Sequence, residues 1–144
     1  MAASHRILRE AGVDVDIATP GGVSPTVDSL SLDERGGLAP ADAEEFRTYL
    51  GGLGDDLAHP LPLAEVPSDD YDALCIPGGH APMVDLAVDK EFGRLLNAAQ
   101  ARGTIVAALC HGGAALLGAT DADASRPHGG SWRPCQPPPL ITDQ

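Results

Sequence analysis

One stretch, residues 104–118, constrains the fold of this chain more than any other. It begins with the apolar run Thr-Ile-Val-Ala-Ala-Leu, which is typical of a strand buried on both faces of a sheet. A Cys-His-Gly step follows directly at Cys110, and small residues then lead into an expected helix. A sharp strand-to-helix turn of this kind presents its apical side chain at the carboxyl end of a sheet. We therefore expect Cys110 to occupy a nucleophile elbow.

The residues around Cys110 fit such a turn. Ala108 and Gly112 stand two positions before and two positions after the cysteine, and their small size leaves room for the backbone to bend. The N-terminus of the helix that follows would stabilise a thiolate at Cys110. A cysteine active site is therefore the first functional hypothesis.

Extended and helical patterns alternate along the rest of the chain. The patterns predict strands over 13–18, 71–76 and 104–109, helices over 3–11, 41–53, 82–102 and 112–119, and a long loop over 21–40. The helix within 82–102 should bury Phe92, Leu95, Leu96 and Ala99. Alternation of this kind around an apolar strand indicates an α/β protein with a parallel sheet covered by helices.

The composition excludes several classes of protein. With 144 residues, 43% of them hydrophobic, the chain fits one globular domain that can bury a core. No apolar run approaches the roughly 18 residues of a membrane span, and no signal peptide is expected. A net charge of −12 argues against nucleic acid and anionic membranes as partners. The three cysteines predict neither a disulfide framework nor a zinc site, which favours the cytoplasm.

A second loop should lie beside the elbow. Gly78, Gly79 and His80 follow the strand over 71–76, and the carboxyl ends of neighbouring parallel strands meet at one edge of a sheet. The backbone amides of Gly79 and His111 could then form an oxyanion hole beside the Cys110 thiol. The alternative is that the two glycines only make a tight turn. His80 either lines this pocket or lies on the surface of the turn.

Several of these segments resemble one known family. The order DYDALCIPGGHAPMVDL, then GTIVAALCHGGAALL, is similar to the ThiJ/PfpI superfamily, within the class I glutamine amidotransferase-like fold. The segments REAGVDVDIATPGG and SPTVDSLSLD resemble its branch of glyoxalase III-type heat-shock chaperones. The resemblance covers residues 2–119.

The resemblance implies a flavodoxin-like parallel sheet sandwiched by helices, in a protein that is usually a homodimer. Carried onto this sequence, Cys110 would be the nucleophile and His111 its acid/base or orienting partner, with Gly78, Gly79, His80 and Gly112 around them. The branch converts methylglyoxal to D-lactate without a cofactor or metal, through a hemithioacetal, an enediol and a thioester. Other branches are amidases, peptidases or protein deglycases, so the expected substrate is a small aldehyde or an acyl compound.

Two departures from the family pattern bear on activity. The family's catalytic glutamate lies after its first strand and would fall immediately before Met1, so we expect both that strand and that carboxylate to be missing. The closest acid, Glu10, should lie in solvent, whereas His5 could approach the pocket. At the other end, residues 1–119 are expected to form a partial domain without the family's C-terminal part. Residues 120–144 are rich in proline and glycine and are expected to form a disordered tail.

Two classes of function stay open. The chain is either a glyoxalase III-type or hydrolase-type enzyme that uses Cys110, or a non-catalytic member that acts as a thiol sensor or chaperone-like surface. Cys75, in the middle of an apolar strand, is expected to be a core residue. Loss of a central strand would expose sheet surface and favour dimers or larger assemblies.

Overall fold

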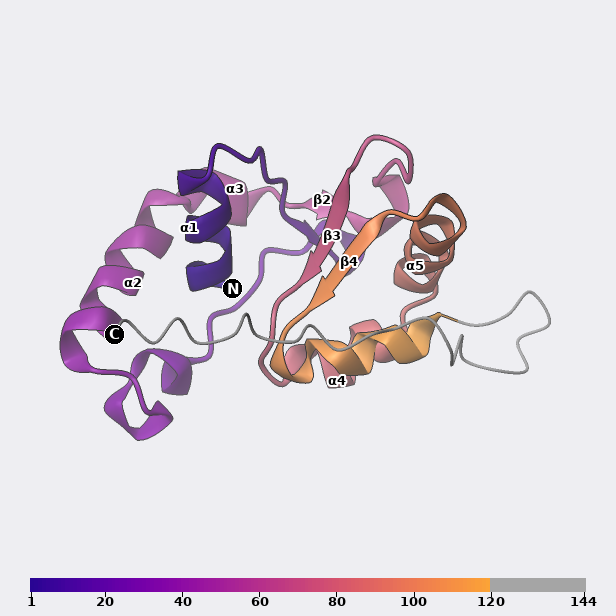
Figure 1. Ribbon diagram of the computed structural model, residues 1–144. Helices are drawn as coiled ribbons and strands as arrows, with labels where there is room; N and C mark the ends of the chain where they lie inside the picture. The colour runs from indigo at the N-terminus through magenta and orange to yellow at the C-terminus, as the bar shows by residue number, and fades with distance from the viewer. Residues whose placement is uncertain (120–144) are drawn as a thin grey trace, which may run out of the picture.

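The computed structural model describes residues 1–119 (Figure 1). Its helices are α1 (Ala2–Glu10), α2 (Pro40–Gly52), α3 (Gly54–Ala58), α4 (Ala81–Val84) and α5 (Lys90–Arg102). Its strands are β1 (Ala18–Thr19), β2 (Leu61–Pro62), β3 (Ala73–Ile76) and β4 (Ile105–Ala108). Short 3₁₀ helices connect them: η1 (Pro20–Gly22), η2 (Ser29–Leu32), η3 (Glu34–Gly36), η4 (Leu63–Glu65), η5 (Leu86–Val88) and η6 (Cys110–Gly118). The tail predicted over 120–144 lies outside the described residues.

The strands form two parallel pairs. β1 pairs with β2, and β3 pairs with β4 in a register that sets Ala73 opposite Ile105 and Ile76 opposite Ala108. The predicted α/β class with parallel strands is thus confirmed. The strand predicted over 13–18 is much shorter, since only Ala18 and Thr19 pair with β2. The Ile17 carbonyl accepts one further hydrogen bond from the Leu61 amide at 2.8 Å. Residues 13–16 have the strand pattern, but the described part of the chain offers them no neighbouring strand to pair with.

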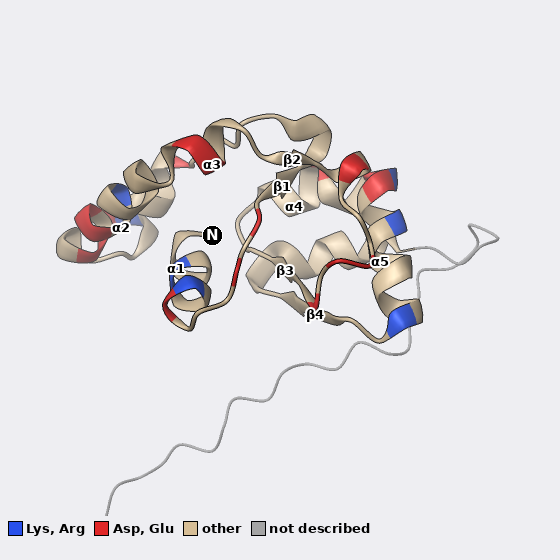
Figure 2. Cartoon of the chain, turned by 90° about the horizontal axis from the view of Figure 1, so that it is seen from above, with Lys and Arg blue, Asp and Glu red and all other residues tan. Residues whose placement is uncertain are grey.

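A hydrogen bond joins the segments that lead into the two pairs. The Tyr71 hydroxyl donates to the Asp16 carboxylate at 2.8 Å. Burial and this bond raise the pKa of Tyr71 to about 12. Figure 2 shows acidic residues on these two entering segments and on α2 and α3. The acidic segments before β1 and β3 therefore lie at the amino ends of their strands, away from the loops that follow β3 and β4.

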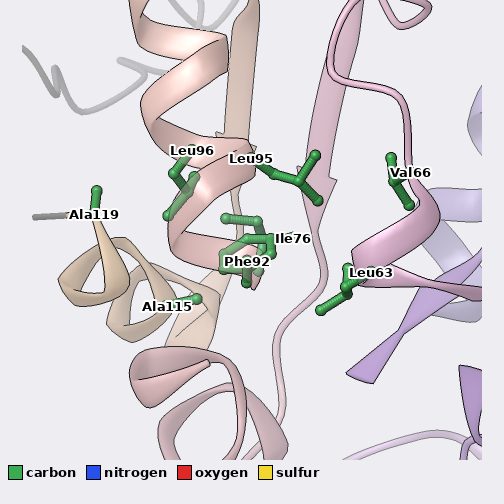
Figure 3. Packing of buried hydrophobic residues seen from close by; sticks show 8 residues of the cluster. All are labelled: Leu63, Val66, Ile76, Phe92, Leu95, Leu96, Ala115 and Ala119. Atoms are coloured by element: carbon green, nitrogen blue, oxygen red, sulfur yellow. The ribbon is translucent and has the colours of Figure 1, made fainter. Parts of the chain in front are cut away.

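The core lies between α5 and one face of the β3–β4 pair (Figure 3). Helix α5 begins where the Asp89 carboxylate accepts a hydrogen bond from the Phe92 amide at 2.8 Å, and it ends at Gly103, whose φ of +72° suits glycine. The four residues predicted to be buried on this helix are all buried. The cluster consists of Leu63, Val66, Ile76, Phe92, Leu95, Leu96, Ala115 and Ala119.

The opposite face of the β3–β4 pair is exposed. Side chains alternate along a strand, so Leu74 and Ile76 point toward α5 whereas Cys75 points the other way. Its neighbours Ala73, Ile105 and Ala107 are exposed as well. The expectation that Cys75 is a core residue is therefore wrong, and the β4 run is not buried on both faces. An apolar sequence shows that a strand is suited to burial, but not which described element covers each face.

The element after β4 also differs from its prediction. An α-helix was expected over 112–119, but residues Cys110–Gly118 form the 3₁₀ helix η6. Three glycines within this element weaken the α-helical preference of its sequence. Between residues 1 and 119, no helix has the length and apolar character needed to cross a membrane.

Candidate active site

Cys110 lies at a strained turn between β4 and η6. The Leu109 amide extends the ladder to β3 by donating to the Ile76 carbonyl at 3.0 Å, and the chain then turns sharply. Cys110 has a φ of +50°, the one positive φ outside glycine among residues 1–119. A non-glycine residue in this region costs free energy and persists only where its surroundings hold it. The predicted elbow is thus present in the backbone.

Two glycines let the loops after β3 and β4 approach each other. A Cβ atom added to Gly78 would lie 2.7 Å from the Cβ of Cys110 and 3.1 Å from the Leu109 carbonyl oxygen. A Cβ atom on Gly112 would lie 2.7 Å from the Ile76 carbonyl oxygen. Distances under 3.0 Å essentially never occur for a Cβ atom in proteins, and neither the Cβ of a neighbouring residue nor a backbone oxygen can move aside like the end of a flexible side chain. Both glycines are therefore needed for the close packing of the two loops.

Two histidines accompany the thiol. The Cys110 Sγ lies 3.5 Å from Nδ1 of His111, which is the next residue. The His111 ring stacks on that of His80, with centroids 5.5 Å apart and ring planes inclined by 25°. The sequence placed His80 and His111 at one edge of the sheet but gave no sign of the stack, which depends on the approach of two loops.

The site is open to solvent. Cys110, His80 and His111 are all exposed. A small cavity lined by Val66, Tyr71 and Leu95, among others, lies beside the amino ends of β3 and β4 and is separate from the thiol. Residues 77–81 and 109–114 contain no Asp or Glu, so the two site loops carry no negative side chain.

The other candidate residues lie in different surroundings. Gly79 has a φ of +101°, which favours glycine, and within residues 1–119 its amide donates no hydrogen bond. His5 is buried between α1 and α2, where its Nδ1 lies 2.8 Å from the Tyr49 hydroxyl. Glu10 is exposed and pairs with Arg6 at 3.8 Å. The expectation that Glu10 lies in solvent is confirmed, and the contacts of His5 are with α2 rather than with the thiol.

The part of the chain that the structure describes offers the thiol no carboxylate. No ion pair joins Asp or Glu to His111 there, and no three of its His, Cys, Asp and Glu residues are grouped so that they could hold a metal ion. The chemistry available to these residues is therefore that of a thiol beside an imidazole.

These features define a class of protein: an α/β domain with parallel strands, in which a strained elbow presents a cysteine next to a histidine. The chain belongs to the DJ-1/PfpI family, whose family model matches residues 2–133. The family predicted from the motifs around His80 and Cys110 is thus confirmed.

Curated relatives indicate which members of the family this chain is similar to. A protein named protein/nucleic acid deglycase HchA from Staphylococcus aureus strain bovine RF122 / ET3-1 is 34% identical over 118 residues. Its counterpart from strain MRSA252 is 33% identical over 118 residues. In both cases the alignment covers 78% of this chain but 38% of the relative. The chain is thus a distant relative of the HchA deglycases and matches well under half of their length.

Proposed function

We propose that Cys110 is the nucleophile of a cofactor-independent glyoxalase III-type reaction, in which methylglyoxal or a similar small aldehyde becomes a 2-hydroxy acid such as D-lactate. The observation that carries the proposal is the Cys110 thiol at a strained elbow, 3.5 Å from the His111 imidazole. A nucleophile beside a base is the signature of covalent catalysis. The proposal includes the setting implied by the resemblance: a flavodoxin-like sandwich, acting as a homodimer in the cytoplasm.

The first step needs only the residues at the elbow. The thiolate sulfur of Cys110 bonds to the aldehyde carbon, and the carbonyl electron pair moves to oxygen. The amides of Gly79 and His111 would donate to this oxygen, and the His111 imidazolium would then protonate it. The product is a neutral hemithioacetal on Cys110.

The later steps need further proton transfers. A base removes the hydrogen from the former aldehyde carbon, and the adjacent carbonyl oxygen is protonated to give an enediol. Protonation of the second carbon and loss of the hydroxyl proton from the sulfur-bearing carbon give a lactoyl thioester, and water then releases lactate and the thiol. His111 is the one base in contact with Cys110 among residues 1–119, and loss of a general base typically slows a reaction by ~10²–10⁴-fold. We therefore propose weak turnover for this chain.

A second candidate function is deglycation, which both the name of the deglycase relatives and the open site favour. Cys110, His80 and His111 are exposed, so a carbonyl adduct on a bulky molecule could reach the thiol as readily as a free aldehyde. In the first covalent step the Cys110 sulfur would bond to the adduct carbon that carries the amine nitrogen, and the C–N bond would break as the amine leaves with a proton from the His111 imidazolium.

The proposal is tested by incubating the chain and its Cys110→Ser variant with methylglyoxal. Intact-mass and peptide mass spectrometry should find an adduct on Cys110 that is absent from the variant, together with slow release of D-lactate. An adduct on Cys110 without lactate would limit the chain to the first step and favour a thiol sensor. No adduct on Cys110 would overturn the proposal. Recovery of unmodified lysine side chains in a methylglyoxal-treated peptide, together with release of lactate, tests the second candidate.

A further inference from the structure

We propose that His80 is a positioning residue that holds the His111 imidazole with its Nδ1 toward the Cys110 thiol. The observation is the stack of the two rings, 5.5 Å between centroids and 25° between planes. The inference rests on the proposed function, since it assumes that His111 serves the thiol. It adds a role for His80 that acts through His111 and not on the substrate.

The local backbone alone does not fix the orientation of the His111 ring toward the Cys110 thiol. Cys110 and His111 are adjacent, and adjacent side chains do not face each other on a regular helix. His111 is also exposed, so little protein surrounds its ring. A flat ring on one face restricts rotation of the imidazole and keeps Nδ1 at 3.5 Å from the sulfur.

His80 is well placed to act as a fixed platform. The loop that carries it is held against the elbow by the contact of Gly78 with Cys110 and by the hydrogen bond from the Leu109 amide to the Ile76 carbonyl at 3.0 Å. Movement of one loop would therefore move the other. The distance between the two rings is set by backbone packing and not only by the side chains.

Within residues 1–119, the His111 ring contacts the Cys110 sulfur and the His80 ring. No carboxylate on or between α4, η5 and α5 forms an ion pair with His111 in the described residues: neither Asp85 and Asp89, which cap η5 and α5, nor Glu91 on α5. The ring stack is therefore the contact that can hold the imidazole in place.

The test compares His80→Ala with His80→Phe, which keeps a flat ring but has no titrating group. The rate of alkylation by iodoacetamide is measured at each cysteine by peptide mass spectrometry from pH 5 to pH 9. We expect His80→Ala to slow the alkylation of Cys110 about two- to fivefold at pH 7, because a freely rotating His111 ring assists the thiol less well, and we expect His80→Phe to react at nearly the wild-type rate. Cys75 in the same molecule reports the fold and should not change.

Two outcomes would overturn the inference: His80→Ala reacting like wild type, or His80→Phe being as slow as His80→Ala. The second result would mean that the proton or charge of His80 matters and not its ring. The His111→Ala variant separates this failure from that of the proposed function. If His111→Ala leaves Cys110 unchanged, the proposed role of His111 itself fails. If His111→Ala slows Cys110 but His80→Ala does not, only the positioning role fails.

Discussion

At the scale of single residues, the site depends on the lack of a side chain at Gly78 and Gly112 as much as on the side chains of the cysteine and histidines. The elbow strains Cys110, and the chain keeps this conformation because the loop after β3 packs directly on it. A hydrogen atom in place of a side chain at Gly78 makes that contact possible. The geometry of the thiol is thus set by backbone packing between two strand ends.

Substitution of Gly78 by Ala should disturb the elbow. The new methyl group would lie 2.7 Å from the Cβ of Cys110, and overpacking of this kind costs about 1–3 kcal/mol. The matched control is Gly113→Ala, because a Cβ there meets nothing within 4 Å. Urea unfolding should show a lower midpoint for Gly78→Ala alone, together with a changed rate of Cys110 alkylation. Equal midpoints for the two variants would contradict the role of Gly78.

The two described cysteines should differ in reactivity. Both residues are exposed, but Cys110 lies beside His111, whereas partial burial of the Cys75 thiol raises its pKa above the usual range. Because the thiolate is the reacting form, we expect Cys110 to be alkylated at least roughly threefold faster than Cys75 at pH 7. Peptide mass spectrometry after a short iodoacetamide pulse measures both sites in one sample. Equal rates, or faster labelling of Cys75, would refute the elbow as an activating feature.

At the scale of elements, local signals in the sequence predicted much of the fold. The periodic apolar residues of α5 were sufficient to predict a helix within 82–102 and its buried face. β2 and α3 were missed, because strands of two residues and helices of five leave little pattern. The short length of β1 and the exposure of Cys75 depend on which elements pack nearby, as does the stack of His80 on His111. Such non-local features are not encoded in the pattern of any one segment.

Helices α1 and α2 form a unit of their own. Their contact joins His5 to Tyr49, Arg6 to Glu45 at 2.6 Å, and the Arg6 guanidinium to the Phe46 ring at 5.0 Å. Nε2 of His5 is buried and has no hydrogen-bond partner within the described residues. This element pair is therefore held by polar contacts as much as by apolar packing.

The contact between α1 and α2 should weaken in mild acid. Burial lowers the pKa of His5, with a further contribution from Arg9 that Asp56 opposes. The unfolded chain then binds more protons below pH ~6.5, so the free energy of unfolding should fall as the pH drops from 7.5 to 5.5. Urea unfolding at both pH values should show this loss in the wild type and less of it in His5→Phe.

The Tyr49→Phe variant is the control for that measurement. It removes the hydrogen bond to His5 and should cost about 0.5–1.5 kcal/mol at both pH values, while the dependence on pH persists. If the free energy of unfolding depends on pH to the same extent in the wild type and in His5→Phe, a group other than His5 is responsible for that dependence.

At the scale of the whole molecule, the exposed face of the β3–β4 pair is the least usual feature. Parallel sheets are normally covered on both faces, but here α5 covers one face and Ile105 on the other is 68% exposed. Leu109, which follows β4, is 46% exposed, and Ala73, Cys75 and Ala107 complete an apolar surface. A net charge of −12 favours solubility, while this surface favours association.

We expect the chain to associate with other copies of itself at high concentration despite its net charge. The chain should bind the dye ANS and show a mass that rises with concentration in light scattering, and it should unfold over a broad temperature range. Ile105→Thr should reduce both association and dye binding, because threonine keeps the β-branched shape of the strand residue but adds a hydroxyl group to the surface. Val23→Thr is the matched control, since Val23 is also 68% exposed but lies after η1, outside this surface. A wild-type chain that is monomeric at all concentrations and melts sharply would show that the exposed face does not drive association. An equal effect of the two substitutions would show that association depends on general hydrophobicity and not on the face of β3 and β4.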